Sequence, residues 1–139
     1  EDDFTIVYYC DNCKYIKDFG GGRLVACFQP HLFTRTRDFA GEFGRALALA
    51  DEIVVLGIYP AREDPLPGVT GRLVADAAQA LATGHVHYVE TLAEAAPALA
   101  AIVRPADLVV TLGAGDVTRA GPELARLLRS REQHRGDPA

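Results

Sequence analysis

The stretch that decides the fold is "RLVACFQPHLFTRTRDFAGEFGRALALADEIVVLGIY", residues 23–59. Its first part, 23–29, is a short apolar run with β-branched and aromatic residues, which is typical of a buried strand. Residues 36–50 carry apolar side chains at helical spacing, and 51–59 is again an apolar run. Strand, helix and strand in this order indicate two parallel strands joined by a crossover helix.

The same alternation continues through the rest of the chain. Helices are expected at 71–82, 91–103 and 121–130, and strands at 85–90 and 107–115. The strands are continuous apolar runs, which favours a parallel sheet buried between two helical layers. We therefore predict an α/β fold: a Rossmann-like three-layer domain whose mostly parallel sheet has helices on both faces.

The expected helix at 91–103 opens with a capping box, formed by Thr91 and Glu94. Pro97 lies inside this helix, where a proline costs about 3 kcal/mol. We therefore expect either a kink at this proline or a helix that starts late.

The composition of the chain changes near residue 20. Both lysines and the only asparagine lie before this point, and the remainder is rich in alanine, arginine, glycine, leucine and valine. We interpret 1–20 as an atypical leader or an altered segment, 21–130 as the folded domain, and 131–139 as a frayed tail.

Charge and cysteine content exclude several classes of protein. The 139 residues suit one domain, and a net charge of −5, from 14 basic and 19 acidic residues, argues against a general binder of nucleic acid or membrane surfaces. No run of about 18 apolar residues is present, so we expect no membrane-spanning helix. Three unevenly placed cysteines fit a reducing compartment, so we expect a cytoplasmic protein.

Polar, proline-rich and glycine-rich segments follow three of the expected strands. They are "QPHLFTRTR" at 29–37, "PAREDPLPG" at 60–68 and "GAGDVTRAG" at 113–121. In parallel sheets of this class, ligands bind beyond the carboxyl ends of the strands. The sequence therefore predicts a ligand site built from these three loops.

The first of these loops carries a basic group, His31, Arg35 and Arg37. Cations at the start of a helix oppose its dipole, which suggests that they serve an anionic ligand. The forked donors of arginine match a carboxylate or a phosphate. The alternative interpretation is a solvated helix start.

The "GAGDVT" segment admits three interpretations. As a dinucleotide loop of the G-x-G-x-x-G type it fails at Thr118, and Asp116 would face the pyrophosphate with a like charge. It could instead be a tight glycine turn without a ligand. It could also be a turn whose backbone N–H groups bind part of a substrate.

Cys10, Cys13, Cys27 and His31 have a spacing that resembles a zinc site. Cys27, however, lies inside an expected strand, where a small buried side chain fits. We therefore predict no metal site and keep a zinc-bound interaction domain as an alternative. His85 and His87, which alternate along another expected strand, are interpreted as partly exposed structural residues.

The loop motifs carry a resemblance to a known family. "FQPHLFTRTRDF", "IVVLGIYPAREDPLPGV" and "DLVVTLGAGDVTRAGPEL" occur in this order, and over about 21–130 the chain resembles the C-terminal domain of the Mur ligases. The similarity points to the branch that joins L-alanine to UDP-N-acetylmuramate. It implies a Rossmann-like domain that closes on a central ATPase domain and helps to bind the incoming amino acid.

The resemblance also implies the reaction, its cofactors and its partners. The full-length enzyme would be an ATP-dependent amide ligase that uses ATP, Mg²⁺, UDP-N-acetylmuramate and L-alanine, in peptidoglycan synthesis. The chain holds no G-x-x-x-x-G-K-S/T loop, so we expect this isolated domain to bind no cofactor and to be inactive. A related Mur-type ligase that adds a peptide, and a stand-alone binding module, are the alternatives.

Site residues follow from the same resemblance. Leu32 stands where many members carry a further arginine, and Asp2 and Asp3 match the acids of a family "DDY-x-HHP" motif whose histidines and proline are absent here. These two aspartates are weak nucleotide-binding candidates. The predicted L-alanine pocket consists of His31, Arg35, Thr36, Gly113, Ala114, Gly115 and Asp116.

Overall fold

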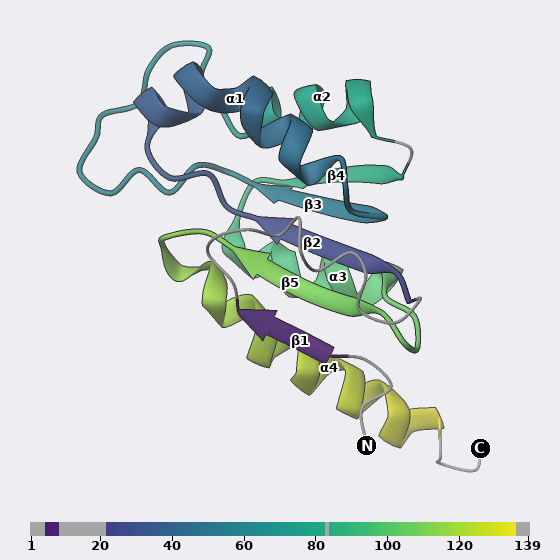
Figure 1. Cartoon of the computed structure of the whole chain (residues 1–139). Coiled ribbons are helices and arrows are strands. Elements are labelled where there is room, and N and C mark those ends of the chain that lie inside the picture. The colour runs from purple at the N-terminus through teal and green to yellow at the C-terminus, as the bar shows by residue number, and fades with distance from the viewer. Residues whose placement is uncertain (1–4, 9–21, 83, 136–139) are drawn as a thin grey trace.

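The computed structural model describes residues 5–8, 22–82 and 84–135, and it shows a parallel sheet between two helical layers (Figure 1). The predicted α/β fold is therefore confirmed. The five strands, in the spatial order β1-β5-β2-β3-β4, are β1 (Thr5–Tyr8), β2 (Leu24–Phe28), β3 (Glu52–Leu56), β4 (His85–Val89) and β5 (Leu108–Leu112). The helices are α1 (Phe33–Leu47), α2 (Arg72–Leu81), α3 (Ala95–Ile102) and α4 (Ala120–Arg135), with short 3₁₀ helices η2 (Leu92–Glu94) and η3 (Asp116–Arg119).

Two hydrophobic cores lie on opposite faces of the sheet because successive strand residues point to opposite sides. In β2, for example, Leu24 and Ala26 belong to the core beneath α1 and α2, whereas Val25 and Cys27 belong to the core beneath α3 and α4. Both faces are apolar, so each strand appears in the sequence as a continuous apolar run.

The order in which strands are added to the sheet reverses between β2 and β5, although all strands are parallel. From β2 it moves outward through β3 to β4, and it then crosses back to place β5 on the other side of β2. The connection after β2 runs to α1 on one face, and the connection after β5 runs to α4 on the other face (Figure 1). A crevice at the carboxyl ends of two such strands is the usual ligand site of open α/β sheets.

Three differences from the sequence-based expectation concern α1, α4 and β1. Helix α1 begins at Phe33 rather than at residue 36, because a carboxylate from another loop caps it, as described below. Helix α4 continues to Arg135, so 131–135 is helical and not a tail; Arg131 anchors this part by donating a hydrogen bond to the Ala100 carbonyl in α3 (2.9 Å). Strand β1, which the sequence did not predict, pairs with β5.

Of the two outcomes expected for Pro97, a kink or a helix that starts late, the late start is confirmed. The capping box of Thr91 and Glu94 caps the N-terminus of the short helix η2, and α3 starts only at Ala95. Pro97 therefore lies in the first turn of α3, where a missing N–H group costs no intrahelical hydrogen bond.

The edge of the sheet opposite the three predicted loops is held together by ion pairs and hydrogen bonds. Arg23 contacts Asp107 through two hydrogen bonds of 3.0 and 2.8 Å. The buried Glu52 carboxylate contacts His85 (2.8 Å) and His87 (3.4 Å) on the neighbouring strand. Burial alone would raise the pKa of Glu52, but the contacts with both histidines outweigh it and lower this pKa. The two histidines thus partner a buried carboxylate at this edge.

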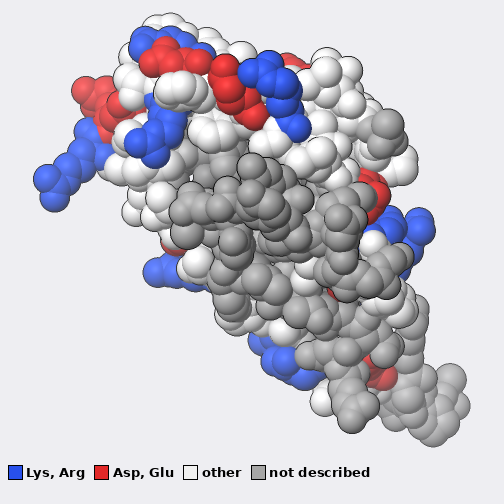
Figure 2. All heavy atoms as spheres, viewed as in Figure 1, with Lys and Arg blue, Asp and Glu red and all other residues white. Residues whose placement is uncertain are grey.

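Basic and acidic side chains are interspersed on the described surface over α1 (Figure 2). Arg37 pairs with Asp38, and Arg45 pairs with Glu42. Such mutual neutralisation is unlike the single-sign patch that binds a phosphate backbone. None of the helices in the described ranges has both the length and the apolar character needed to cross a bilayer.

Candidate functional site

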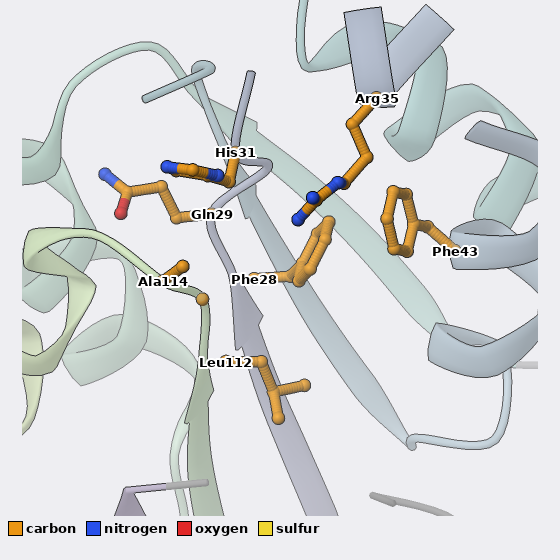
Figure 3. Close-up of a pocket in the computed structure, with 8 residues that line it drawn as sticks. Phe28, Gln29, His31, Arg35, Phe43, Leu112 and Ala114 are labelled. Atoms are coloured by element: carbon orange, nitrogen blue, oxygen red, sulfur yellow. The ribbon is translucent and has the colours of Figure 1, made fainter. Parts of the chain in front are cut away.

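A pocket of about 330 Å³ lies at the carboxyl ends of β2 and β5, where the chain reverses direction (Figure 3). We call it the carboxyl-edge pocket. One side is apolar and has a guanidinium beside it, and the other side carries an amide and an imidazole. Its lining residues are Phe28, Gln29, His31, Arg35, Phe43, Leu112, Gly113 and Ala114.

The apolar side comes from β2, α1 and β5. The rings of Phe28 and Phe43 lie 5.1 Å apart at a tilt of 44°. Leu112, the last residue of β5, lies at the base of the view in Figure 3. A ligand with a small apolar group would gain about 25 cal/mol for each Å² of apolar surface that it buries here.

Arg35 brings a free positive charge to this pocket. It lies in the first turn of α1 and is exposed, and its guanidinium has no hydrogen bond or ion pair with any residue in the described ranges. In Figure 3 the guanidinium lies beside the Phe28 and Phe43 rings. An arginine left without an anion beside an apolar wall is suited to bind a carboxylate.

The anion at the start of α1 is supplied by the chain itself. The Glu63 carboxylate accepts hydrogen bonds from the backbone N–H of Phe33 (2.5 Å) and Thr34 (3.1 Å) and from the Thr34 hydroxyl (2.5 Å). The bond from the Thr34 hydroxyl is the main reason that the pKa of Glu63 is lowered. The N-terminus of α1 is therefore already occupied by Glu63 and is not available to a ligand. The positive charge that the pocket offers to a ligand comes from the side chain of Arg35 and not from the helix dipole.

The turn after β5 is held against β2 by Gln29. The backbone N–H of Gln29 donates to the Leu112 carbonyl (2.9 Å), and its side-chain amide donates to the Asp116 carboxylate (2.9 Å). Gln29 is 5% exposed, so the bond to Asp116 is shielded from water. The turn can be fixed in this way because residue 115 is glycine: a Cβ atom there would lie 2.9 Å from the Gln29 Oε1.

The structure brings together only some of the residues predicted from the sequence. His31, Arg35, Gly113 and Ala114 line the pocket. Gly115 and Asp116 do not line the pocket. Gly115 lies against the Tyr59 ring, and Asp116 accepts a hydrogen bond from Gln29.

The placement of Thr36 at the pocket is wrong. This residue is fully buried, and its hydroxyl donates to the Leu32 carbonyl (2.7 Å) inside the helix. One helical step of about 100° separates its side chain from that of Arg35. Thr36 therefore cannot offer its hydroxyl to a ligand in the pocket.

Other candidates lie away from the pocket or cannot be placed. Asp2, Asp3, Cys10 and Cys13 fall outside the described residues. Cys27 is fully buried, and burial raises its pKa to about 12, which disfavours the thiolate that a metal needs. Within the described ranges no cluster of three or more metal-ligating side chains is present.

Several pocket residues escaped the sequence reasoning. Phe28, Phe43 and Leu112 lie in expected strands or helices and were given no role in the site. Gln29 begins one of the three predicted ligand loops, but no role was assigned to it. Tyr59 contacts His31 and the turn at Gly115, although it is not among the lining residues. From the sequence it was expected at the end of a strand. Its position directly before the proline of a polar loop is a signal that could have indicated a role near the site.

Comparison with known proteins places the chain in a family. A family model described as Mur ligase, glutamate ligase domain, matches residues 12–115. The chain is 63% identical over 112 residues to a UDP-N-acetylmuramate–L-alanine ligase of Cutibacterium acnes and 62% identical over 112 residues to one of Kineococcus radiotolerans. Each alignment covers 81% of this chain but 24% of the relative, so the chain spans about a quarter of the length of these curated relatives.

A solved structure supports the fold. The crystal structure of a UDP-N-acetylmuramate-alanine ligase from Thermotoga maritima superimposes with a TM-score of 0.60 and 24% identity, over 91% of this chain and 27% of the other. The likeness supports the fold, and the matched family model covers most of the chain. The chain therefore belongs to the Mur ligase family and contains its glutamate ligase domain.

Proposed function

We propose that this chain is the amino-acid-binding domain of a cytoplasmic, ATP-dependent ligase that joins L-alanine to UDP-N-acetylmuramate in peptidoglycan synthesis. The observation that carries the proposal is the Arg35 guanidinium, which lies beside an apolar wall at the carboxyl ends of β2 and β5 and has no partner among the described residues. The relatives at 63% and 62% identity are UDP-N-acetylmuramate–L-alanine ligases, and they suggest the substrate.

The pocket complements the groups of an amino acid. The carboxylate would accept hydrogen bonds from Arg35, and the methyl group of alanine would pack against the Phe28 and Phe43 rings. The amine then remains free to point out of this domain. Because both ends of a small molecule are held, its amine is presented in one orientation, and such positioning is a large part of the catalysis of bimolecular reactions.

In the proposed reaction, ATP transfers its terminal phosphoryl group to the carboxylate of UDP-N-acetylmuramate. The amine of L-alanine attacks the acyl carbon of this acyl phosphate, the amide C–N bond forms, and inorganic phosphate leaves while the amine loses a proton. ATP, Mg²⁺ and UDP-N-acetylmuramate would be bound by other domains of the complete enzyme. The contribution of this chain is to hold the amino acid and, on closure, to exclude water.

A second candidate is a ligase for a larger amino acid such as glutamate. The pocket of about 330 Å³ holds on the order of ten water molecules at roughly 30 Å³ each, which is more room than alanine fills. The description of the matched family model as a glutamate ligase domain favours the same alternative.

The two candidates are separated by substrate choice in the complete ligase. Amide formation on UDP-N-acetylmuramate is measured with L-alanine and with L-glutamate under saturating ATP and Mg²⁺. We expect L-alanine to give the higher kcat/KM by at least about two orders of magnitude, because an apolar wall leaves an extra carboxylate unpaired. A preference for L-glutamate would overturn the proposal. The isolated chain should give no amide and no ATP turnover.

A further inference from the structure

His31 lies in the carboxyl-edge pocket, and no hydrogen bond with a described residue orients its ring. Its Nδ1 atom is buried and has no partner, and its Nε2 atom has no hydrogen bond with the described residues either. Histidines that act on ligands usually have their ring orientation fixed by a hydrogen bond to one ring nitrogen. Something other than a hydrogen bond within the described ranges must therefore fix this ring.

Tyr59 is joined to the His31 segment through the backbone. The Tyr59 N–H donates to the Pro30 carbonyl (2.8 Å), and the Leu32 N–H donates to the Tyr59 carbonyl (2.9 Å). These two bonds make an isolated parallel bridge between His31 and Tyr59. Residues paired in this way project their side chains to the same side, so the bridge places the two rings next to each other.

The two rings are nearly parallel. Their centroids lie 5.8 Å apart with an interplanar angle of 17°. This stacking is the only ring contact of the imidazole in the described part of the chain. The Tyr59 ring is therefore the described ring against which the His31 imidazole lies.

Tyr59 also contacts the turn that follows β5. A Cβ atom at position 115 would lie 2.7 Å from both Cγ and Cδ2 of the Tyr59 ring, so the glycine allows the ring and the turn to touch. Tyr59 thus lies between the loop after β2 and the turn after β5, which are the two segments that supply the polar lining of the pocket.

We propose that Tyr59 is a positioning residue: its ring orients the His31 imidazole and sets the spacing between His31 and the turn at 113–116. The consequence for catalysis rests on the proposed function, whereas the orientation of the ring does not. Tyr59 itself need not touch the amino acid, because it acts through His31 and the turn.

The orientation is tested first in the 139-residue chain by NMR of the histidine rings, with the His31 signals assigned through His31→Gln. Tyr59→Leu removes the ring but keeps the backbone bridge, and it should shift and broaden the His31 signals. Tyr59→Phe should leave them almost unchanged. Tyr88→Leu is the matched control, because this tyrosine contacts Arg72 and Glu90 and lies outside the pocket.

The consequence is tested in the complete ligase. Tyr59→Leu should raise the KM for L-alanine about two- to tenfold, the range expected for loss of one aromatic pair, with the KM for ATP unchanged. Tyr59→Phe should restore the KM to within about twofold, since it retains the ring. A purely structural role would lower stability in Tyr59→Leu and Tyr88→Leu alike without this selective change.

Two results would overturn the inference. One is an unchanged His31 spectrum in Tyr59→Leu. The other is an unchanged KM for L-alanine in Tyr59→Leu when Arg35→Ala raises it. If Tyr59→Leu does not fold, Gly115→Ala serves instead, because its methyl group pushes the Tyr59 ring, and an unshifted His31 spectrum would count against the proposal. If Arg35→Ala has no effect, the proposed function fails, and the NMR result still decides the role of Tyr59.

Discussion

Replacement of Arg35 by alanine in the complete ligase should weaken the use of L-alanine strongly. The guanidinium has no partner among the described residues, so its removal leaves no protein group unpaired. Any loss should therefore reflect the missing ligand contact. A hydrogen bond between charged groups contributes about 1.5–3 kcal/mol, which corresponds to roughly one to two orders of magnitude in affinity. Leu32 cannot share this contact, so we expect a value near the upper end.

The assay is steady-state kinetics with L-alanine and ATP varied separately. The KM for L-alanine should rise by that factor, and the KM for ATP should stay nearly the same. The fold should survive, because replacing an exposed residue that has no hydrogen bond or ion pair with the described residues changes the free energy of unfolding by no more than about 0.5 kcal/mol. Arg45→Ala is the matched control on the same helix, since Arg45 pairs with Glu42 on the exposed surface and does not line the pocket. An unchanged KM for L-alanine in folded Arg35→Ala protein would refute the reasoning.

Three further predictions concern the scaffold of the site. Glu63→Gln should destabilise the chain at pH 7, and the difference from the unchanged chain should disappear in acid. The folded pKa of Glu63 is lowered, so its stabilisation is present above the ordinary glutamate pKa of about 4.3 and is lost as the pH falls through the folded value; urea unfolding of both proteins at several pH values would reveal this. Gly44→Ala should lower the free energy of unfolding, measured in urea, by about 1–3 kcal/mol, because the added methyl group would lie 2.5 Å from the Ala77 Cβ in α2. The KM for L-alanine should not change, and an unaltered unfolding midpoint would show that α1 and α2 can separate without cost. Cys27 should resist alkylation in the folded chain, because burial raises its pKa to about 12, and peptide mapping that finds it modified as fast as in urea would contradict its burial.

The sequence predicted the order and type of most elements because the sheet is buried on both faces. Strand β3 then shows an apolar run at 53–56, and the crossover helix before it shows the 3.6-residue spacing. The start of α1 could not be placed in the same way. Its capping carboxylate, Glu63, lies about thirty residues away in the sequence, and no local signal marks the pairing.

The pocket was predicted in outline but not in composition. Loops that follow parallel strands meet at one edge of the sheet, so His31, Arg35 and the glycine turn could be brought together from the sequence. The strand order was not accessible, because it depends on β5 pairing with β2 across the whole chain. Thr36 was misplaced because the resemblance gave a neighbouring position, whereas the helical rotation decides which side chain faces the ligand.

The division of the chain at residue 20 stays a prediction. Strand β1 lies before this point and pairs in parallel with β5, and the matched family model begins at residue 12. Residues 9–21 lie outside the described part of the chain.

The central claim is that Arg35 receives the carboxylate of the amino acid substrate. Its most direct test is a crystal structure of the complete ligase with L-alanine and a non-hydrolysable ATP analogue. We predict that the alanine carboxylate lies about 2.7–2.9 Å from the Arg35 guanidinium nitrogens, with the methyl group toward the Phe28 and Phe43 rings. An alanine bound elsewhere, with Arg35 facing solvent, would contradict the account.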